Sequence, residues 1–359
     1  MKKSDTDAII RDINKMCERR GEIRLMEICG THTVAFFRSG LKSLMPSNLK
    51  LISGPGCPVC VTAQGYIDAA CQLASKPSVT VCTYGDMVRV PGKLGSLAEQ
   101  RAKGGHVVIV YSARDALKYA IEHPNETVVF LAVGFETTTP ATASVITEAK
   151  AKCVRNFLIL PGHKLVVPAM MALLSSGDVP IDGFMCPGHV SVVIGANAYK
   201  PITDTYHKPC VVTGFEPIQM LSGVAELVKQ ITNSEASIGN VYGAVVKDEG
   251  NTVALNLISS VFEPATVCWR AIGKIPDSGL ALRKEYKKFD ASMICETDLN
   301  EDYEMEGCLC GKVIQGILEP MECPLFGKAC VPSHPIGPCM VSSEGTCAAW
   351  HKYNIGISD

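Results

Sequence analysis

The chain has 359 residues, a formal net charge of −2 and 47% hydrophobic residues, so two or three globular domains with sizeable cores are expected. Only 19% of the residues are charged, which argues against a disordered chain. Because there is no basic excess, we expect no nucleic-acid partner. No apolar run approaches the roughly 18 residues that a membrane-spanning helix needs, so we expect no membrane partner either.

Seventeen cysteines are unusual for a chain of this length. The N-terminal sequence MKKSDTDAIIRDINKMCERRG is charged throughout and does not resemble an export signal. We therefore expect a cytoplasmic location. In that reducing compartment, clustered cysteines more often indicate metal binding or catalysis than structural disulfides.

The N-terminal segment predicts a helix over about residues 5–20, ended by Gly21, and then a short strand, IRLMEIC, that ends at Cys29. From about residue 49 to residue 215, short β-rich runs such as LKLIS and TVVFLAVGF alternate with helix-like stretches. This alternation is typical of parallel sheets that are covered by helices on both faces. We therefore predict the α/β class, with two Rossmann-like parallel-sheet domains plus a smaller C-terminal domain.

The alternation breaks down after about residue 240. The run LALRKEYKKFDA predicts an exposed helix, and the segment ETDLNEDYEMEG, with six acids and no base, predicts a solvated surface loop. We place a domain seam near residues 121–126. The predicted divisions are residues 1–47, an N-terminal helix and CGTHT segment packing with the C-terminal domain; 48–123, an α/β domain with GPGCPVC; 124–238, a second α/β domain; and 239–359, the C-terminal domain.

Residue types that bind metals or transfer protons follow the carboxyl ends of several predicted strands. In open α/β sheets, ligands bind just outside these strand ends. Loop chemistry explains the glycines and prolines found there, but it does not explain so many cysteine, histidine and acidic side chains. The residues expected at this functional edge are Cys57, Cys60, Asp86, Glu136, His163, Cys186 and His189.

The stretch GPGCPVC places Cys57 and Cys60 three residues apart, just before a helix-like segment. A helix N-terminus presents free N–H groups and a positive dipole end, which stabilise a thiolate. The spacing also allows a disulfide, so a redox role is indicated. The pair is equally half of a zinc site, but the sequence holds no second C-x-x-C to complete one.

A third thiol, Cys29, stands at a strand end in MEICGTHTVAFF. In one interpretation it is a structural cysteine, and the following threonines cap a helix. In the other it is a nucleophile or a soft metal ligand, with His32 nearby to assist. The motif alone leaves both interpretations open.

The C-terminal tail is poor in apolar periodicity, so it is not expected to fold around a hydrophobic core. A metal centre would order such a segment instead. Zinc ribbons favour two tight C-x2-C knuckles, which the tail lacks, whereas its open spacing with flanking prolines favours an iron–sulfur cluster. The chemistry of the thiols leaves the fourth cluster ligand open. The tail cysteines are Cys308, Cys310, Cys323, Cys330, Cys339 and Cys347.

Taken together, the motifs resemble the hydrogenase maturation protein HypD family over nearly the whole chain, from about residue 20 to residue 352. The motifs that carry the resemblance are CGTHT, GPGCPVC, TYGDMVRVPG, GFETTTP, PGHVS and CPLFGKACVP…GPCMVSSEGTCAAW. The tail spacing C-x12-C-x6-C-x16-C resembles the family's cluster motif. It implies that a [4Fe–4S] cluster is bound in the C-terminal domain by Cys310, Cys323, Cys330 and Cys347.

The resemblance implies a scaffold that assembles the Fe(CN)2CO centre of [NiFe] hydrogenases with two partners, a small HypC-type chaperone and a HypE-type cyanide donor. Cys29 would hold the iron under assembly, and Cys57 and Cys60 would form a redox-active dithiol supplied with electrons by the cluster. The remaining expected site residues would transfer protons or orient ligands. These are His32, Asp86, Glu136 and His189.

Two other functions remain as alternatives. The pairing of a cluster with a dithiol also resembles ferredoxin:thioredoxin reductase, which predicts an iron–sulfur-dependent disulfide reductase with no need for Cys29. A zinc-stabilised binding module is the third possibility, and it leaves the strand-end histidine and acidic side chains without a task.

Overall fold

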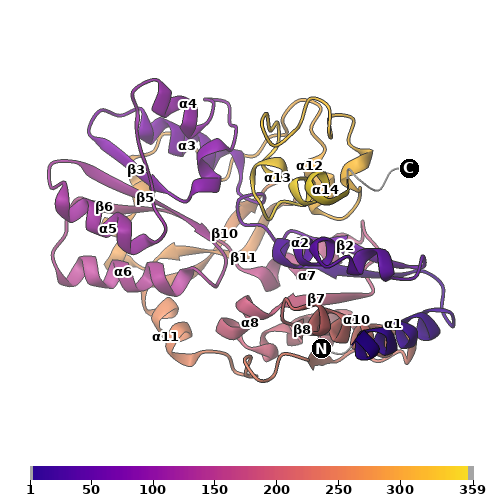
Figure 1. The fold of residues 1–359 in the computed structure, drawn as a ribbon. Coiled ribbons are helices and arrows are strands. Elements are labelled where there is room, and N and C mark those ends of the chain that lie inside the picture. Colours follow the sequence, from indigo (N-terminus) through magenta and orange to yellow (C-terminus); the bar gives the residue numbers. More distant parts are fainter. Residues whose placement is uncertain (1–2, 355–359) are drawn as a thin grey trace.

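The structure, a computed structural model, describes residues 3–354 and contains two parallel β-sheets (Figure 1). The first sheet has five strands, in the order β2 (Leu49–Ser53), β1 (Ile23–Glu27), β7 (Gly183–Pro187), β8 (Cys210–Thr213) and β9 (Ile238–Asn240). The second sheet has four strands, in the order β4 (His106–Ile109), β3 (Val79–Thr83), β5 (Thr127–Gly134) and β6 (Phe157–His163). The predicted α/β class with Rossmann-like parallel sheets is confirmed.

The central strands form where the sequence is continuously apolar. All five residues of β3 are buried, and so are all residues of β5 after Thr127. Strands that are buried on both faces are typical of parallel sheets covered by helices. The helices that follow the strands of the first sheet or cover it are α1 (Lys3–Cys17), α2 (Gly30–Arg38), α8 (Gly188–Ile194), α9 (Lys200–Tyr206) and α10 (Pro217–Thr232).

The helices that connect or flank the strands of the second sheet are α3 (Gln64–Ala74), α4 (Leu97–Ala102), α5 (Ala113–Glu122) and α6 (Thr139–Ala151). Helix α7 (Val166–Ser176) leads from β6 back to the first sheet, and α11 (Thr252–Val261) contacts α6. The C-terminal helices are α12 (Cys310–Ile314), α13 (Pro338–Val341) and α14 (Thr346–Asn354). No helix in residues 3–354 is both long enough and apolar enough to cross a membrane.

The predicted domain seam is wrong, because the chain changes sheet twice. Residues 121–126 lie between β4 and β5, and both of these strands pair with β3 in the same sheet. The first sheet instead joins β1 and β2 to β7, with Leu25 opposite Gly183. Residues 48–123 and 124–238 therefore do not form separate sheets. Local periodicity identifies strands, but it does not reveal that a strand pairs with another far along the chain.

An antiparallel hairpin of β10 (Phe262–Trp269) and β11 (Gly273–Leu282) follows the second sheet. Lys164, the residue after β6, bridges to Gly279 of β11, and Ile159 of β6 bridges to Asp290, which lies beyond the hairpin. The helix predicted in LALRKEYKKFDA is therefore wrong at its start, since residues 280–282 belong to β11. A short 3-10 helix, Lys284–Phe289, follows the strand and buries Tyr286 and Phe289 in the core.

The acidic segment ETDLNEDYEMEG is the surface loop that its charge predicts, since five of its six acids are exposed, but Asp302 is half-buried and ties the loop to its neighbours. The Asp302 carboxylate accepts hydrogen bonds from the backbone N–H groups of Gln64, at the start of α3, and of Ala271, in the hairpin turn. The Asn300 side chain accepts one from the Cys268 N–H. Acidic and amide side chains satisfy free N–H groups at helix starts and turns, so this segment fastens α3 to the hairpin.

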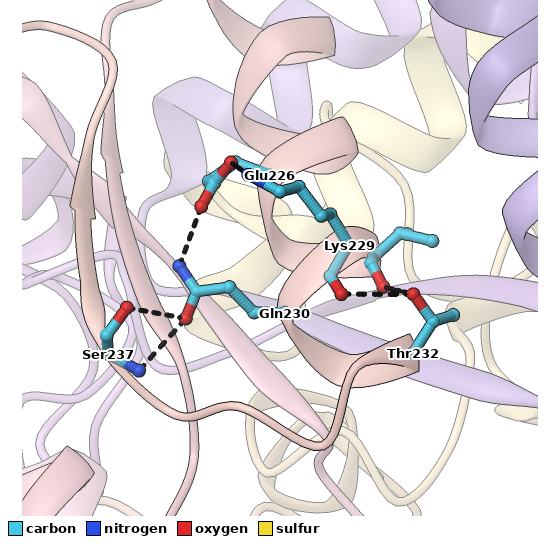
Figure 2. Close-up of polar contacts among 6 residues, drawn as sticks. Glu226, Lys229, Gln230, Thr232 and Ser237 are labelled. Carbon is cyan, nitrogen blue, oxygen red and sulfur yellow. Dashed lines mark hydrogen bonds and ion pairs between the residues drawn. The ribbon is translucent and has the colours of Figure 1, made fainter.

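The last strand of the first sheet is anchored by the end of α10 (Figure 2). Gln230 is buried, and its side-chain carbonyl accepts hydrogen bonds from the N–H of Ser237 at 2.9 Å and from the Ser237 hydroxyl at 3.0 Å. The side-chain NH2 of Gln230 donates to Glu226. Thr232 closes the helix by donating to the carbonyls of Val228 and Lys229. Because buried amides need partners, these bonds set where β9 begins.

The N-terminal segment and the C-terminal tail meet at the first sheet (Figure 1). Helix α1 packs on α10, whereas α2 packs on α14. The Phe37 ring of α2 meets the Trp350 ring of α14 edge-on at 5.4 Å, and the Lys42 ammonium lies 4.0 Å from the centre of the Trp350 ring. This aromatic contact holds the tail beside the strand end that carries Cys29.

Candidate functional site

Cys29 follows β1 and is the N-cap residue of α2. Its side chain is buried, and its Sγ lies 3.9 Å from Nε2 of His189, which follows β7. Burial raises the pKa of the Cys29 thiol to about 12, while the Thr31 side chain and the N–H groups of Thr31 and His32 act in the opposite direction. The thiol therefore keeps its proton until a metal cation takes the place of that proton or a base accepts it.

Two histidines flank the Phe215 ring beside this thiol. The ring centres of His32 and His189 lie 4.6 Å and 5.0 Å from that of Phe215. His32 is fully buried, and its Nε2 contacts the Gly214 carbonyl and the Thr213 hydroxyl, whereas its Nδ1 has no partner among the described residues. Burial lowers the pKa of His32 to about 3, so this imidazole is neutral.

The GPGCPVC loop lies directly on the Cys29 segment. The Gly30 N–H donates to the Gly56 carbonyl at 3.2 Å, which brings Cys57, the next residue, to the same strand ends. The Cys60 N–H donates to the Cys57 Sγ at 3.3 Å, and both thiols are buried. The structure therefore places the loop that carries Cys57 and Cys60 beside the separate loop that carries Cys29.

The expectation that a helix N-terminus activates Cys57 and Cys60 is wrong. Helix α3 begins at Gln64, with Ala63 as its N-cap, and a turn separates it from Cys60. Burial raises the pKa of Cys60 well above its usual value. The Cys60 thiol therefore keeps its proton, and its reactivity needs a base, a metal or another sulfur.

The Cys57 and Cys60 loop contacts the C-terminal tail. The Cys60 thiol donates to the carbonyl of Pro338, the residue before Cys339, at 3.8 Å. Cys339 in turn lines one small cavity together with Cys310 and Cys347. All seventeen cysteines lie in the described part of the chain and are free thiols. Cys339, which the sequence leaves with Cys308 as an alternative cluster ligand, thus lies between the C-x-x-C pair and the other tail cysteines.

The six tail cysteines line one small cavity. Its wall is formed by Cys308, Cys310, Cys323, Cys330, Cys339 and Cys347, together with Leu325, Phe326, Gly337 and Met340. Within residues 3–354, no three histidine, cysteine or acidic side chains are arranged to hold a single metal ion. A [4Fe–4S] cluster has a different requirement, because each of its four thiolates binds a different iron atom. Six thiols around one cavity fit that donor set.

A larger cavity of about 550 Å³ lies between the two sheets, where the loops after β1, β2, β3, β5 and β7 meet. His189 and Asp86 line it, as do Thr31 and Glu344. The Thr31 hydroxyl donates to Glu344 at 2.8 Å, and the Ser342 hydroxyl donates to Asp86 at 2.8 Å. The tail segment before Cys347 therefore forms one wall of the cavity that adjoins Cys29.

Glu136 is not directed into this cavity, although the strand-end pattern predicts it there. Its Oε1 accepts a hydrogen bond from the Val166 N–H at 2.9 Å, at the start of α7, and its buried Oε2 has no partner among the described residues. Burial raises the pKa of Glu136 to about 7. The carboxyl group thus caps a neighbouring helix rather than facing a ligand.

Two more strand-end residues face the core. His163 is buried, with Nε2 at 3.0 Å from the Thr142 hydroxyl, and burial lowers its pKa to about 4. Cys186 is fully buried and contacts Cys210 and Tyr199. Neither residue is among those that line the 550 Å³ cavity.

Sequence reasoning missed Thr31, Phe215, Glu344 and the position of Cys339 between the C-x-x-C pair and the other tail cysteines. Thr31 and Glu344 stand inside quoted motifs, CGTHT and VSSEGTC, but their hydrogen bond joins segments more than 300 positions apart. No local pattern signals such a pairing. Phe215 follows β8 in the run CVVTGF, where an aromatic residue is indistinguishable from a core residue until the two histidine rings are placed.

This geometry defines a class of protein: a two-sheet α/β protein with a thiol-rich site where the strand ends of one sheet meet a cysteine-lined tail. The family model described as "HypD: Hydrogenase formation hypA family" matches residues 4–354. The chain belongs to the HypD family.

Curated relatives agree with this assignment. The chain is 46% identical over 332 residues to the hydrogenase maturation factor HypD of Escherichia coli, covering 92% of this chain and 89% of that protein. It is 44% identical to HypD of Azotobacter vinelandii, with the same coverage. It is 41% identical to HypD1 of Bradyrhizobium diazoefficiens, covering 98% of this chain and 94% of that protein. Family membership supports a role in hydrogenase maturation.

Proposed function

We propose that this chain is a cytoplasmic scaffold on which the Fe(CN)2CO centre of [NiFe] hydrogenases is assembled, and that Cys29 holds the iron as cargo. The observation that carries the proposal is the Cys29 Sγ, 3.9 Å from His189 and beside the cavity between the two sheets. Soft thiolates suit low-valent iron that carries cyanide and carbon monoxide. Binding iron would replace the proton that burial otherwise keeps on the thiol.

The cavity beside Cys29 supports the part of the proposal that concerns partners. A HypC-type chaperone would supply a second ligand to the iron, and a HypE-type protein would deliver cyanide; both assignments rest on the family resemblance. The cavity of about 550 Å³ lies between the edges of the two sheets. It is large enough for a small iron complex together with a segment of the chaperone that supplies a ligand to the iron. His189 and Asp86 line it and are placed to orient ligands or transfer protons.

The Cys57 and Cys60 thiols are proposed as the redox pair. Closing a disulfide between them releases two electrons and two protons, and the electrons would adjust the redox state of the bound iron or of a ligand precursor. The contact of Gly30 with Gly56 supports this role, because it holds the pair at the loop that carries Cys29. The hydrogen bond of 3.8 Å from the Cys60 thiol to the Pro338 carbonyl, beside Cys339, supports an electron supply from the tail.

We propose that the tail thiols hold a [4Fe–4S] cluster, which supplies one-electron transfer when bound. The spacing implies Cys310, Cys323, Cys330 and Cys347, and Cys308 stays open as an alternative to Cys310. Both thiols line the cavity of the tail cysteines, and a Cβ at Gly337 would lie 2.6 Å from the Cys308 Sγ and 3.2 Å from the Cys310 Sγ, so the two sulfurs are neighbours.

The iron site is tested in the complex with the chaperone, purified without oxygen. The Cys29→Ala variant should lose the infrared bands of cyanide and carbon monoxide while keeping the visible absorption of the cluster. The matched control is Cys153→Ser, which removes an exposed thiol and should keep both signals. Unchanged infrared bands in Cys29→Ala would refute Cys29 as the iron ligand.

The cluster and its fourth ligand are tested by iron and sulfide analysis of the same preparations. Wild-type protein should contain about four sulfides and about five irons per chain, four irons in the cluster and one at Cys29, whereas stoichiometric zinc without sulfide would point to a zinc-stabilised module. Comparing Cys308→Ser with Cys310→Ser separates the two ligand sets. Loss of sulfide in Cys308→Ser alone would identify Cys308 as the ligand, and loss in Cys310→Ser alone would identify Cys310, as the spacing implies.

An iron–sulfur-dependent disulfide reductase is the second candidate, favoured by the position of the Cys57 and Cys60 pair, whose Cys60 thiol bonds the Pro338 carbonyl beside the cysteine-lined cavity of the tail. This function predicts turnover of a generic protein disulfide that does not depend on Cys29. A reductase assay of wild-type protein and Cys29→Ala decides between the two functions. Equal, substantial turnover in both proteins would favour the reductase.

A further inference from the structure

Arg270 is a buried cation in the turn between β10 and β11. Its side chain is 4% exposed, yet it forms no ion pair with a carboxylate in the part of the chain that the structure describes. Its Nε donates to the Thr62 carbonyl at 3.0 Å, and its Nη2 donates to the Gln64 Oε1 at 2.6 Å. Both acceptors are neutral, so the positive charge has no direct negative partner. Buried arginines without a partner are costly, and such a charge calls for an explanation.

Two tail thiols are among the groups that surround this charge. A small cavity beside Arg270 is lined by the arginine and by Cys308 and Cys310. The same two cysteines also line the cavity formed by all six tail cysteines. Cys308 and Cys310 therefore stand between the guanidinium on one side and the proposed cluster on the other.

Two acidic residues line the cavity beside Arg270 as well. The Asp302 carboxylate accepts hydrogen bonds from the N–H groups of Gln64 and Ala271, keeps its negative charge and offsets part of the charge of Arg270. Glu304 is exposed, so solvent screens its charge. Arg270 is the cation among the residues that line this cavity, and Cys308 and Cys310 lie on the same cavity.

We propose that Arg270 is a positioning residue that compensates the negative charge of the tail thiolates and raises the midpoint potential of the [4Fe–4S] cluster they hold. This inference rests on the proposed function of the tail. A cluster with four thiolate ligands is an anion, and one-electron reduction adds another negative charge without requiring a proton. A buried cation next to the ligands stabilises the reduced form more than the oxidised form, because the surroundings screen charges weakly.

The test is a redox titration of anaerobically purified full-length protein with dithionite, followed by visible absorption and electron paramagnetic resonance. Arg270→Gln removes the charge, and we expect its reduction equilibrium to be about tenfold less favourable, a shift of about 59 mV to more negative potential for one electron. Arg270→Lys keeps the positive charge but lacks the planar set of N–H donors that the guanidinium group provides. Its potential should stay near that of the wild type.

A second pair of variants keeps Arg270 in place, in case Arg270→Gln does not fold. Gln64→Glu puts a carboxylate on the Nη2 of Arg270 and neutralises it, whereas Gln64→Met removes the acceptor without adding charge. We expect a more negative potential for Gln64→Glu than for Gln64→Met. Equal potentials in this pair, or equal shifts in Arg270→Gln and Arg270→Lys, would overturn the inference alone. Wild-type protein without sulfide would overturn the proposed cluster and the inference with it.

Discussion

Gly56 packs so closely on Cys29 that a Cβ at position 56 would lie 2.3 Å from both the nitrogen and the Cα of Cys29. Atoms at that separation overlap, so only glycine fits between the two loops. The second glycine of GPGCPVC therefore has a packing role. It allows the C-x-x-C pair to approach the thiol proposed to hold iron.

Gly56→Ala should push these two loops apart. Overpacking of this kind typically costs about 1–3 kcal/mol of unfolding free energy, and the displaced loops should also weaken the infrared bands of the chaperone complex. Urea unfolding measures the first effect. Gly21→Ala is the matched control, because a Cβ at Gly21 meets no atom within 4 Å, and it should leave both readouts unchanged. If Gly56→Ala has the same free energy of unfolding as the wild type, the two loops can move apart without loss of stability.

The hydrogen bond of 2.8 Å between the Thr31 hydroxyl and Glu344 ties the Cys29 segment to the tail. In a double-mutant cycle with Thr31→Val and Glu344→Ala, we expect a coupling of about 1 kcal/mol, as for a partly exposed bond to a charged group. Urea unfolding of the four proteins supplies the energies. Thr147→Val, which removes a hydroxyl bonded within α6, should combine additively with Glu344→Ala. Additivity of the Thr31 pair would mean that the two segments are not coupled.

Gly337 packs against two tail sulfurs, since a Cβ there would lie 2.6 Å from the Cys308 Sγ and 3.2 Å from the Cys310 Sγ. Gly337→Ala should therefore displace both thiols and reduce iron and sulfide per chain by roughly half or more, because well-packed sites yield little to an added methyl. Metal and sulfide analysis of anaerobic preparations checks this, with Gly21→Ala again as the control. Full cluster content in Gly337→Ala would argue against Cys308 and Cys310 as ligands held in these positions.

The raised pKa of Glu136 makes stability depend on pH. Burial raises this pKa to about 7, so the folded chain keeps the proton while the unfolded chain loses it near pH 4.5. The unfolded state binds fewer protons between these values, and the contribution of Glu136 to stability falls as pH rises through this window. Glu136→Gln, which does not ionise, should gain up to about 3 kcal/mol relative to wild type between pH 5 and pH 8.

Urea unfolding of wild type and Glu136→Gln at both pH values gives this difference directly. His32 and His163 have lowered pKa values, so their contributions make the free energy of unfolding rise with pH between the folded and the usual pKa. Both proteins contain these histidines, so the difference between their free energies of unfolding removes this contribution. A difference that does not change with pH would mean that Glu136 is ionised in the folded chain.

The strands and most helices of the two sheets were predictable because each is a local pattern. Runs such as TVVFLAVGF are apolar enough to be buried on both faces, and they are strands in the structure. Predictions were incomplete or wrong where a segment's environment is set by distant residues. The acidic segment around Asp302 is fixed by N–H groups of α3 and the hairpin turn, and charge alone does not indicate them. Likewise, Glu136 follows a strand end, but the start of α7 determines where its carboxyl points.

The α/β class, the family and the cysteines that could carry chemistry follow from residue type, spacing and short-range periodicity. Which strands share a sheet depends on the tertiary structure, since the pairing of β1 with β7 joins segments that local patterns do not connect. The tertiary structure also brings the Cys60 thiol to the Pro338 carbonyl beside Cys339 and places Cys308, Cys310 and Arg270 around one cavity. Such contacts arise only when the packed elements exclude water between distant segments, so no spacing along the chain encodes them.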